Sequence, residues 1–197
     1  ALLQLRVGLD HQAGAAGGLQ RARERLLHLD VHGLRGGLAA FLGMAGIGLA
    51  QRVLAGAACF PAVDELLAAA PGEGCWWNGR RTRVSTVEAL TAATALVTDD
   101  RTFATPELTA GWRRLAAQVG VARGWGDCFG YLLVATGRAE VMVDPIMNPW
   151  DAACFQPIIE EAGGVITDLT GRRTAFGGSV IATNAALAGA ARECFDA

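Results

Sequence analysis

The segment from Val141 to Gly164 constrains the fold of this chain most, because it predicts a strand, a loop and a helix in immediate succession. An apolar run over 139–143 is typical of a buried strand, and Asp144 followed by Pro145 should end it. A helix is predicted to begin at Asp151 and to end at Gly163-Gly164, since glycine commonly follows the last turn of a helix. The fold must therefore contain a strand that leads directly into a helix.

The position of Asp151 at a helix start has a chemical consequence. The first turn of a helix presents unpaired N–H groups and the positive end of the helix dipole. A carboxylate placed there can hold a metal ion beside a bound phosphate, a geometry that suits phosphoryl chemistry. The same residue also has a purely structural interpretation, because aspartate often caps a helix. The helix start alone does not decide between these two interpretations.

Composition narrows the class of protein. The chain has 197 residues, of which 52% are hydrophobic, so it can bury a substantial core. Its formal net charge of -2 argues against a nucleic-acid partner or an anionic membrane surface, since either needs a clustered basic excess. The longest uncharged run, 36–51, falls short of the ~20 apolar residues of a membrane-spanning helix. It is predicted to be a buried element.

Cysteine usage indicates the compartment. The chain has 5 cysteines, widely scattered and without a Cys-x-x-Cys pair. They are interpreted as reduced core residues rather than zinc ligands or a disulfide framework. The first residues, 1–6, lack a basic stretch leading into an apolar block, so no signal peptide is expected. Together these features predict a cytoplasmic protein.

The pattern of elements changes near residue 90, which predicts two portions, 1–90 and 91–197. In the first, short apolar runs and the turn signal Asn78-Gly79 predict an antiparallel meander. In the second, strands alternate with helices; strands are expected at 94–97, 139–143, 165–167 and 180–182, and helices at 106–119, at 128–136, from Asp151, and after a capping Asn184. Pro157 should kink the helix from Asp151 or shift its start. The predicted fold class is an α+β or α/β layered sandwich.

Four segments carry a resemblance to a known family. Residues 150–164, Trp-Asp-Ala-Ala-Cys-Phe-Gln-Pro-Ile-Ile-Glu-Glu-Ala-Gly-Gly, resemble the inositol monophosphatase family signature Trp-Asp-x-Ala-Ala followed by Glu-Ala-Gly-Gly, with Cys154 at the second alanine. Residues 124–137 and 143–151 are similar to the histidinol-phosphate phosphatase branch of that family. Residues 177–184, Gly-Gly-Ser-Val-Ile-Ala-Thr-Asn, complete the family's ending. The resemblance covers residues 60–197.

The resemblance implies an activity and a set of site residues. It implies a Mg²⁺-dependent phosphomonoesterase in which water attacks phosphorus directly and no covalent phosphoenzyme forms. Asp30 and Asp151 would be the catalytic, metal-binding carboxylates, since magnesium requires oxygen ligands from more than one acid. Asp127 and Asp144 would bind the alcohol portion of the substrate. Glu161 would belong to the structural signature rather than to the metal set.

The resemblance also implies that the amino-terminal metal motifs are degraded. Residues 29–35 align with the family's Asp-Pro-Ile-Asp-Gly-Thr loop if one residue is missing, which places Asp30 on the first acid and His32 on the second. Ala15 and Ala16 fall where the family has a pair of glutamates. His32 is a candidate substitute ligand, although imidazole suits transition metals better than magnesium. The family's first helix is expected to be missing.

Three functions stay open at this point. The first is hydrolysis of histidinol phosphate, whose cationic alcohol suits acidic residues better than neutral inositol does. The second is hydrolysis of an inositol phosphate or sugar phosphate. The third is a catalytically inactive protein that binds a phosphorylated metabolite or pairs with an intact paralogue, which Ala15-Ala16 favours. A homodimer is a further expectation, because members of the family are commonly dimers.

Overall fold

The computed structural model describes residues 43–49, 52–126 and 128–196. Two of the predicted site residues, Asp30 and Asp127, therefore lie outside the described residues, as do Ala15, Ala16 and His32. The predicted absence of the family's first helix concerns residues outside these ranges as well. The structure describes the other two site residues, Asp144 and Asp151.

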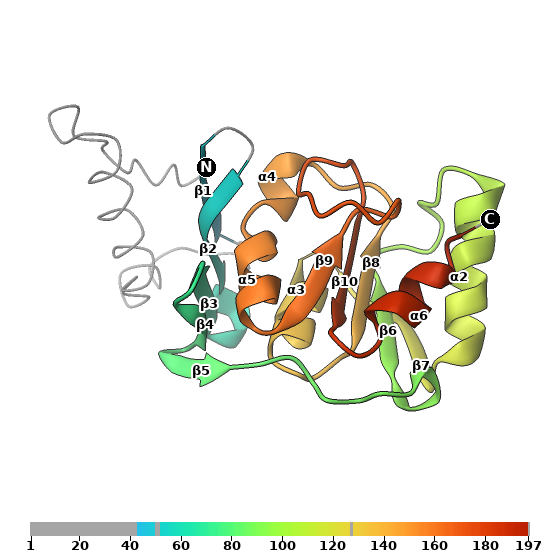
Figure 1. Ribbon diagram of the computed structural model, residues 1–197, viewed down its shortest axis with the longest axis horizontal. Coiled ribbons are helices and arrows are strands. Elements are labelled where there is room, and N and C mark those ends of the chain that lie inside the picture. Colours follow the sequence, from blue (N-terminus) through green and yellow to red (C-terminus); the bar gives the residue numbers. More distant parts are fainter. Residues whose placement is uncertain (1–42, 50–51, 127, 197) are drawn as a thin grey trace, which may run out of the picture.

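The first sheet is an antiparallel meander, as predicted. Its strands follow one another in chain order, β1-β2-β3-β4-β5 (Figure 1). They are β1 (Gly43–Leu49), β2 (Arg52–Phe60), β3 (Glu65–Ala70), β4 (Gly74–Trp77) and β5 (Arg80–Thr82). A single 3-10 turn, η2 (Pro61–Val63), separates β2 from β3.

The turn between β4 and β5 has the chemistry that the sequence predicts. Asn78 and Gly79 have φ angles of 47° and 75°, and positive φ at both central residues gives a turn whose twist matches a hairpin. The Asn78 Oδ1 atom accepts a hydrogen bond of 2.8 Å from the Leu66 backbone N–H. The turn is therefore tied to β3 as well as closing its own hairpin.

The second sheet is mixed, with strand order β7-β6-β8-β10-β9. Its strands are β6 (Thr94–Val97), β7 (Val121–Gly124), β8 (Val141–Asp144), β9 (Gly164–Thr167) and β10 (Val180–Asn184). Strand β6 pairs in parallel with both β7 and β8, whereas β10 is antiparallel to β8 and β9. Strand β7 was not predicted, because this short edge strand carries Arg123 and Gly124 and is largely exposed, so no apolar run marks it.

The helices lie in two layers that alternate with the sheets (Figure 1). Helices α3 (Phe129–Ala135) and α5 (Phe155–Glu161) lie between the two sheets, and α2 (Pro106–Gln118) and α6 (Ala188–Glu193) cover the far face of the second sheet. The predicted layered sandwich is confirmed. No helix in the described part of the chain is long and apolar enough to cross a membrane.

The two hydrophobic clusters follow the alternation of side chains along the central strands. Met142 packs in the cluster between the sheets with Tyr131 of α3 and Phe155 of α5. Val141 and Val143, on the other side of the same strand, pack in the cluster below α2 and α6. Because successive strand residues point to opposite faces, Asp144 at the end of β8 points to the α3 side, like Met142. The division of the chain at residue 90 stays a prediction.

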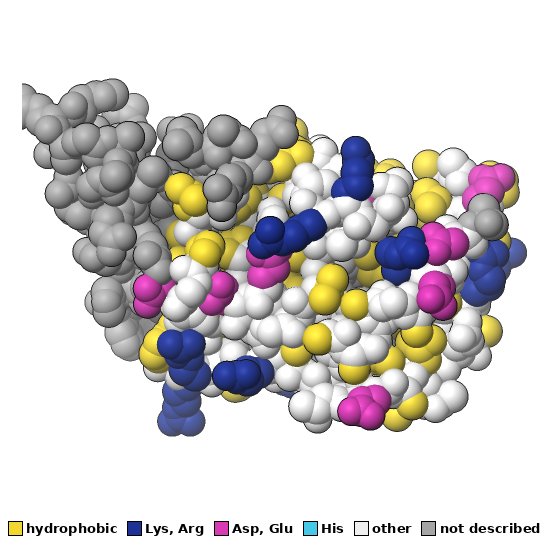
Figure 2. Space-filling view, in the orientation of Figure 1, with side chains coloured by type: hydrophobic (Ala, Val, Ile, Leu, Met, Phe, Trp, Pro, Cys, Tyr) yellow, Lys and Arg dark blue, Asp and Glu magenta, His cyan; other side chains and the backbone are white. Residues whose placement is uncertain are grey.

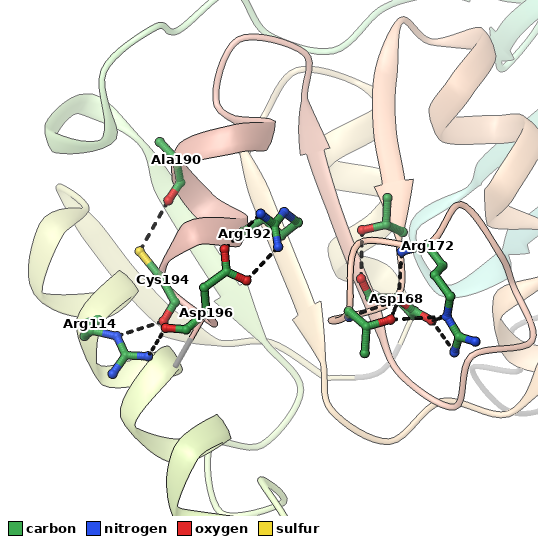
Figure 3. A network of polar contacts seen from close by, with 9 residues as sticks. Arg114, Asp168, Arg172, Ala190, Arg192, Cys194 and Asp196 are labelled. Carbon is green, nitrogen blue, oxygen red and sulfur yellow. Dashed lines mark hydrogen bonds and ion pairs between the residues drawn. The ribbon is translucent and has the colours of Figure 1, made fainter.

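All five cysteines are buried and free, in agreement with the interpretation as reduced core residues. The last of them, Cys194, belongs to a polar latch that holds the end of α6 against α2 (Figure 3). The Arg114 guanidinium donates to the Cys194 carbonyl at 2.9 Å and to the Asp196 carbonyl at 3.2 Å. Arg192 forms an ion pair of 2.7 Å with the Asp196 carboxylate.

Two predicted helix starts are wrong in detail. The helix predicted from Asp151 begins at Pro149 and is broken into α4 (Pro149–Ala152) and α5. The break lies at Ala153, four residues before Pro157. Pro157 has no N–H to donate to the Ala153 carbonyl, and the proline ring clashes with that carbonyl in a regular helix. The effect of Pro157 was therefore predicted correctly, but the start at Asp151 was not.

The helix after β10 begins at Ala188 with Leu187 as its N-cap, rather than at Asn184. Asn184 instead organises the preceding turn. Its Oδ1 atom accepts from the Leu187 N–H at 2.9 Å, and its amide donates to the Ser85 hydroxyl at 3.0 Å and the Val87 carbonyl at 2.8 Å. This buried asparagine therefore holds the turn through three partners.

Substituting Gly56→Ala should destabilise the protein by about 1–3 kcal/mol, the usual cost of overpacking. A Cβ atom at this position in β2 would lie 2.1 Å from the Cys154 carbonyl oxygen, so the sheet and the α4–α5 junction would have to separate. Urea denaturation measures the loss. Gly189→Ala is the matched control, because a Cβ there meets nothing within 4 Å and alanine favours a helix by about 1 kcal/mol. Equal stability of the two variants would contradict the tight contact.

Candidate functional site

Asp144 is a buried carboxylate at the end of a central strand. It is the last residue of β8 and only 5% exposed. The Tyr131 hydroxyl of α3 donates a hydrogen bond of 2.7 Å to its Oδ2 atom. Tyr131 is itself fully buried and stacks on Phe155 of α5, with 4.6 Å between ring centroids. The orientation of the carboxylate is therefore set by both helices of the middle layer.

The Tyr131 hydroxyl is held in its protonated form. Burial raises its pKa well above the ordinary value, and the adjacent Asp144 carboxylate raises it further, both by its charge and by accepting the hydrogen bond. A protonated phenol is an obligatory donor to a carboxylate. The pair thus presents Asp144 as a fixed acceptor, which suits a residue that binds a hydroxyl or ammonium group.

Asp151 lies in the first turn of α4 and is half-buried. The N-cap residue of α4 is Asn148, and its side chain makes no capping hydrogen bond. The Asn148 amide instead lies 3.4 Å from Asp151 Oδ2, a long contact. The structural interpretation of Asp151 as a helix cap is therefore wrong, because the residue is inside the helix.

The helix-dipole argument for Asp151 is also weaker than the sequence indicates. Helix α4 has 4 residues, so few peptide dipoles add up at its start. The carboxylate must act through its own charge. The backbone that follows Asp151 is held in place, since the α4–α5 junction packs directly on β2 at the Gly56–Cys154 contact.

The loop that joins Asp144 to α4 is braced by a neighbouring loop. The Met147 N–H donates to the Gly178 carbonyl at 2.9 Å. That second loop, between β9 and β10, is organised by the fully buried Asp168 (Figure 3). Its carboxylate accepts from the Thr170 N–H and the Arg172 N–H, each at 2.9 Å, and from the Arg172 guanidinium at 2.8 Å.

Burial raises the pKa of Asp168, but the hydrogen bonds from Thr170 and Arg172 and the charge of Arg172 outweigh it and leave the pKa below its ordinary value. Asp168 is therefore an ionised structural group rather than a site residue. The face drawn in Figure 2 carries both acidic and basic side chains, and some of them lie next to each other.

Glu161 also has a structural role, as its place in the family signature implies. Its two carboxylate oxygens accept from the Gly72 N–H at 2.8 Å and the Gly74 N–H at 2.7 Å. Both glycines have positive φ, at 80° and 70°. The end of α5 thus closes the turn between β3 and β4, and Glu161 is occupied by backbone donors.

The fit to a metal ion can be tested on the described residues. No group of three or more His, Cys, Asp or Glu side chains among them could hold a metal ion. They contribute one predicted ligand, Asp151, whereas magnesium takes several oxygen ligands. The described residues therefore supply part of such a site, and Asp30, its predicted partner, lies outside them.

Tyr131 is a residue of the site that the sequence reasoning missed. The signal was present, since a buried tyrosine almost always needs a partner for its hydroxyl. Tyr131 lies in the apolar run 129–135, and its hydroxyl is the only polar side-chain group of that run. The partner could not be identified without knowing that α3 covers the end of β8.

Tyr131 is the only tyrosine of the chain, so its ionisation can be followed directly. Because its folded pKa is raised, its contribution to stability is full below the unfolded value near 10 and is lost as pH rises through the folded value. We expect tyrosinate absorbance in the native protein to appear only with unfolding, and in denaturant at about pH 10. A native midpoint at the ordinary value would contradict the buried hydrogen bond.

Tyr131→Phe is the matched variant for this measurement. It should cost about 1–3 kcal/mol at neutral pH, because Asp144 loses a donor, and should show a smaller fall in stability above pH ~10. The fall should not vanish, since burial raises the pKa of the Cys75 thiol to about 12 in both proteins and acts in the same direction.

Comparison with known proteins agrees with the resemblance seen in the motifs. A histidinol-phosphatase from Chlorobaculum parvum is 44% identical over 128 residues, which cover 64% of this chain and 49% of that protein. A histidinol-phosphatase from Mycobacterium tuberculosis is 33% identical over 132 residues, covering 64% of this chain and 51% of the relative. The chain thus spans about half the length of the curated relatives it matches.

Solved structures share the fold. The extragenic suppressor protein suhB from Bartonella henselae superposes with a TM-score of 0.73 at 25% identity, over 84% of this chain and 64% of that one. An IMPase from Thermotoga maritima gives a TM-score of 0.70 at 27% identity, over 81% and 62%. The sequence profile of the inositol monophosphatase family matches residues 42–195. This chain therefore belongs to the inositol monophosphatase family.

Proposed function

We propose that the protein is a metal-dependent phosphomonoesterase that hydrolyses a small phosphorylated alcohol, with histidinol phosphate as the first candidate. The segment from Asp144 to Asp151 carries this proposal. It joins a buried carboxylate with a fixed orientation to a half-buried carboxylate that is neither a cap nor part of an ion pair described above. The similarity to two histidinol-phosphatases supports the choice of substrate.

Members of this family generally use metal ions. In the proposal, Asp151 and Asp30 hold Mg²⁺. When bound, the ion would neutralise phosphate charge and lower the pKa of a bound water. Asp151 supplies one hard oxygen donor, which is the ligand type that magnesium prefers. Water attacks phosphorus directly in the proposed reaction, and no phosphoenzyme forms.

Asp144 and Asp127 bind the alcohol portion of the substrate in this proposal. Histidinol carries an ammonium group and an imidazole ring, so acidic residues favour it over neutral inositol. The Tyr131 hydrogen bond supports this role for Asp144, because it keeps a carboxylate oriented at the surface end of a buried strand. A cytoplasmic location and a homodimer belong to the same proposal.

Asp151→Asn tests the proposed role in metal binding. The amide keeps the size of the side chain but loses the charge, so phosphate release from histidinol phosphate with Mg²⁺ should fall by a factor of roughly 100 or more. Excess chelator should abolish the wild-type activity. Asp196→Asn, at an exposed acid in the C-terminal latch, should retain activity.

Substrate choice is measured on the wild-type protein by comparing phosphate release from histidinol phosphate and inositol 1-phosphate. A higher kcat/KM for histidinol phosphate is the expected result. A preference for inositol phosphate would replace the first candidate with the second while leaving the reaction class unchanged.

A catalytically inactive binding protein is the second candidate function. The alanines at positions 15 and 16 favour it, as they stand where the resemblance places a glutamate pair. Calorimetric titration with Mg²⁺ separates the candidates, since an inactive protein should take up no metal and release no phosphate while staying folded. Under the enzyme proposal, the double substitution Ala15→Glu and Ala16→Glu should raise turnover.

A further inference from the structure

An aromatic ladder leads from the core of the protein to its surface beside Asp144. Phe60, at the end of β2, is 7% exposed and meets the Phe129 ring edge-on, with 5.5 Å between centroids. Phe129, the first residue of α3, stacks in turn on Trp125, with 5.9 Å between centroids and an angle of 26° between the rings. Trp125 is 47% exposed. A large indole is thus held in place from below while its outer surface meets solvent.

The sheet places Trp125 level with Asp144. Val97 at the end of β6 pairs with Gly124 of β7 on one side and with Val143 of β8 on the other. Trp125 and Asp144 each follow these partners by one residue, at the carboxyl ends of parallel strands. Strands lie about 4.8 Å apart, so two spacings separate the backbones of these residues by about 10 Å.

The two side chains also share one face of the sheet. Asp144 is on the α3 side, where Tyr131 bonds it, and Trp125 is on the same side, where Phe129 stacks on it. The Trp125 N–H donates to the Val97 carbonyl at 2.9 Å, so the strand geometry continues to this residue. Trp125 follows β7 and Asp144 ends β8, the two strands on either side of β6. The indole and the carboxylate therefore lie at the same end of α3.

We infer that Trp125 is a specificity-determining residue that stacks on a planar ring in the leaving-group alcohol of the substrate. This inference rests on the proposed function and adds the chemical class of alcohol that the site prefers. An exposed aromatic ring fixed by a second ring loses little freedom when a ligand stacks on it, and a Trp face attracts cationic rings such as imidazolium. A polyol such as inositol presents no such ring.

The separation of about 10 Å between the two backbones sets how the substrate lies. One end of a small phosphate ester would be near Asp144 and the loop to Asp151, and the ring would lie over Trp125. The alternative role for Trp125 is structural, as a cover for Phe129. The two roles predict different kinetics. If Trp125 only covers Phe129, replacing it should change the activity on every substrate by the same factor.

The kinetic test uses the whole protein with Trp125→Leu and Trp125→Phe. Trp125→Leu should raise KM for histidinol phosphate about tenfold with little change in kcat, and should leave KM for inositol 1-phosphate within about twofold. Trp125→Phe keeps a stacking ring and should restore most of the affinity. Phe176→Leu, at an aromatic residue 41% exposed in the β9–β10 loop, is the matched control and should change neither substrate.

A binding measurement keeps this inference separate from the proposed activity. The protein is labelled with 5-fluorotryptophan, and the Trp125 fluorine resonance, identified by its loss in Trp125→Phe, is followed while histidinol or inositol is added. Histidinol should shift this resonance and inositol should not. Such a shift without any phosphatase activity would overturn the proposed reaction and leave the stacking role standing.

Two results would overturn the stacking role. One is an unshifted Trp125 resonance at saturating histidinol in a protein that hydrolyses histidinol phosphate. The other is an equal loss of activity on both substrates in Trp125→Leu, which indicates a cover for Phe129. If Trp125→Leu fails to fold, as judged by circular dichroism, the fluorine measurement on the wild-type protein decides alone.

Discussion

The close approach of β2 to the α4–α5 junction determines where the candidate site lies. Only a glycine at position 56 lets the Cys154 carbonyl come so near the strand, since any Cβ atom would lie 2.1 Å from that oxygen. The contact sets how deeply α5 enters between the two sheets, and α5 carries Phe155, which supports Tyr131. Asp151 is in the short helix just before this contact. The first sheet therefore positions a carboxylate that belongs to the second half of the chain.

The acidic residues near this region divide into two groups by their partners. Glu161 and Asp168 accept hydrogen bonds from backbone N–H groups, and Asp168 also accepts from the Arg172 guanidinium; these bonds hold turns in place. Asp144 accepts from a side-chain hydroxyl in the protein interior, and the Asp151 carboxylate makes a long contact of 3.4 Å with Asn148 within the part of the chain that the structure describes. Buried carboxylates need donors, and a carboxylate that ties down turns through backbone N–H donors has a structural role.

Contacts from α3 and the β9–β10 loop connect Asp144 and Asp151 to the exposed Trp125. The β9–β10 loop braces the segment between Asp144 and Asp151, and α3 provides Tyr131 for the carboxylate and Phe129 for the indole. Helix α3 thus contacts both a polar residue, Asp144, and an aromatic residue, Trp125, at the carboxyl ends of the parallel strands. Ligands commonly bind at the carboxyl ends of parallel strands, because the polypeptide there turns into loops above a rigid sheet.

The sequence by itself determined the local elements whose signals are local. The Asn78-Gly79 turn, the strand at 94–97 and the break caused by Pro157 depend on φ preferences, apolar runs and a missing N–H, and they were predicted correctly. The family motif marked Asp144 and Asp151 as candidate site residues, and their roles stay predictions. Strand β7 could not be predicted from the sequence, because an exposed edge strand pairs through its backbone and needs no apolar side chains.

Only the tertiary structure decided which of these residues meet. The partnership of Tyr131 with Asp144 and the shared level of Trp125 and Asp144 depend on how β7, β6 and β8 align and on which face α3 covers. Only the structure shows that α4 begins before Asp151. Asp151 is therefore a half-buried residue inside the helix rather than its N-cap. Strand register and helix packing are set by contacts between distant segments, and no short stretch of sequence contains both sides of such a contact.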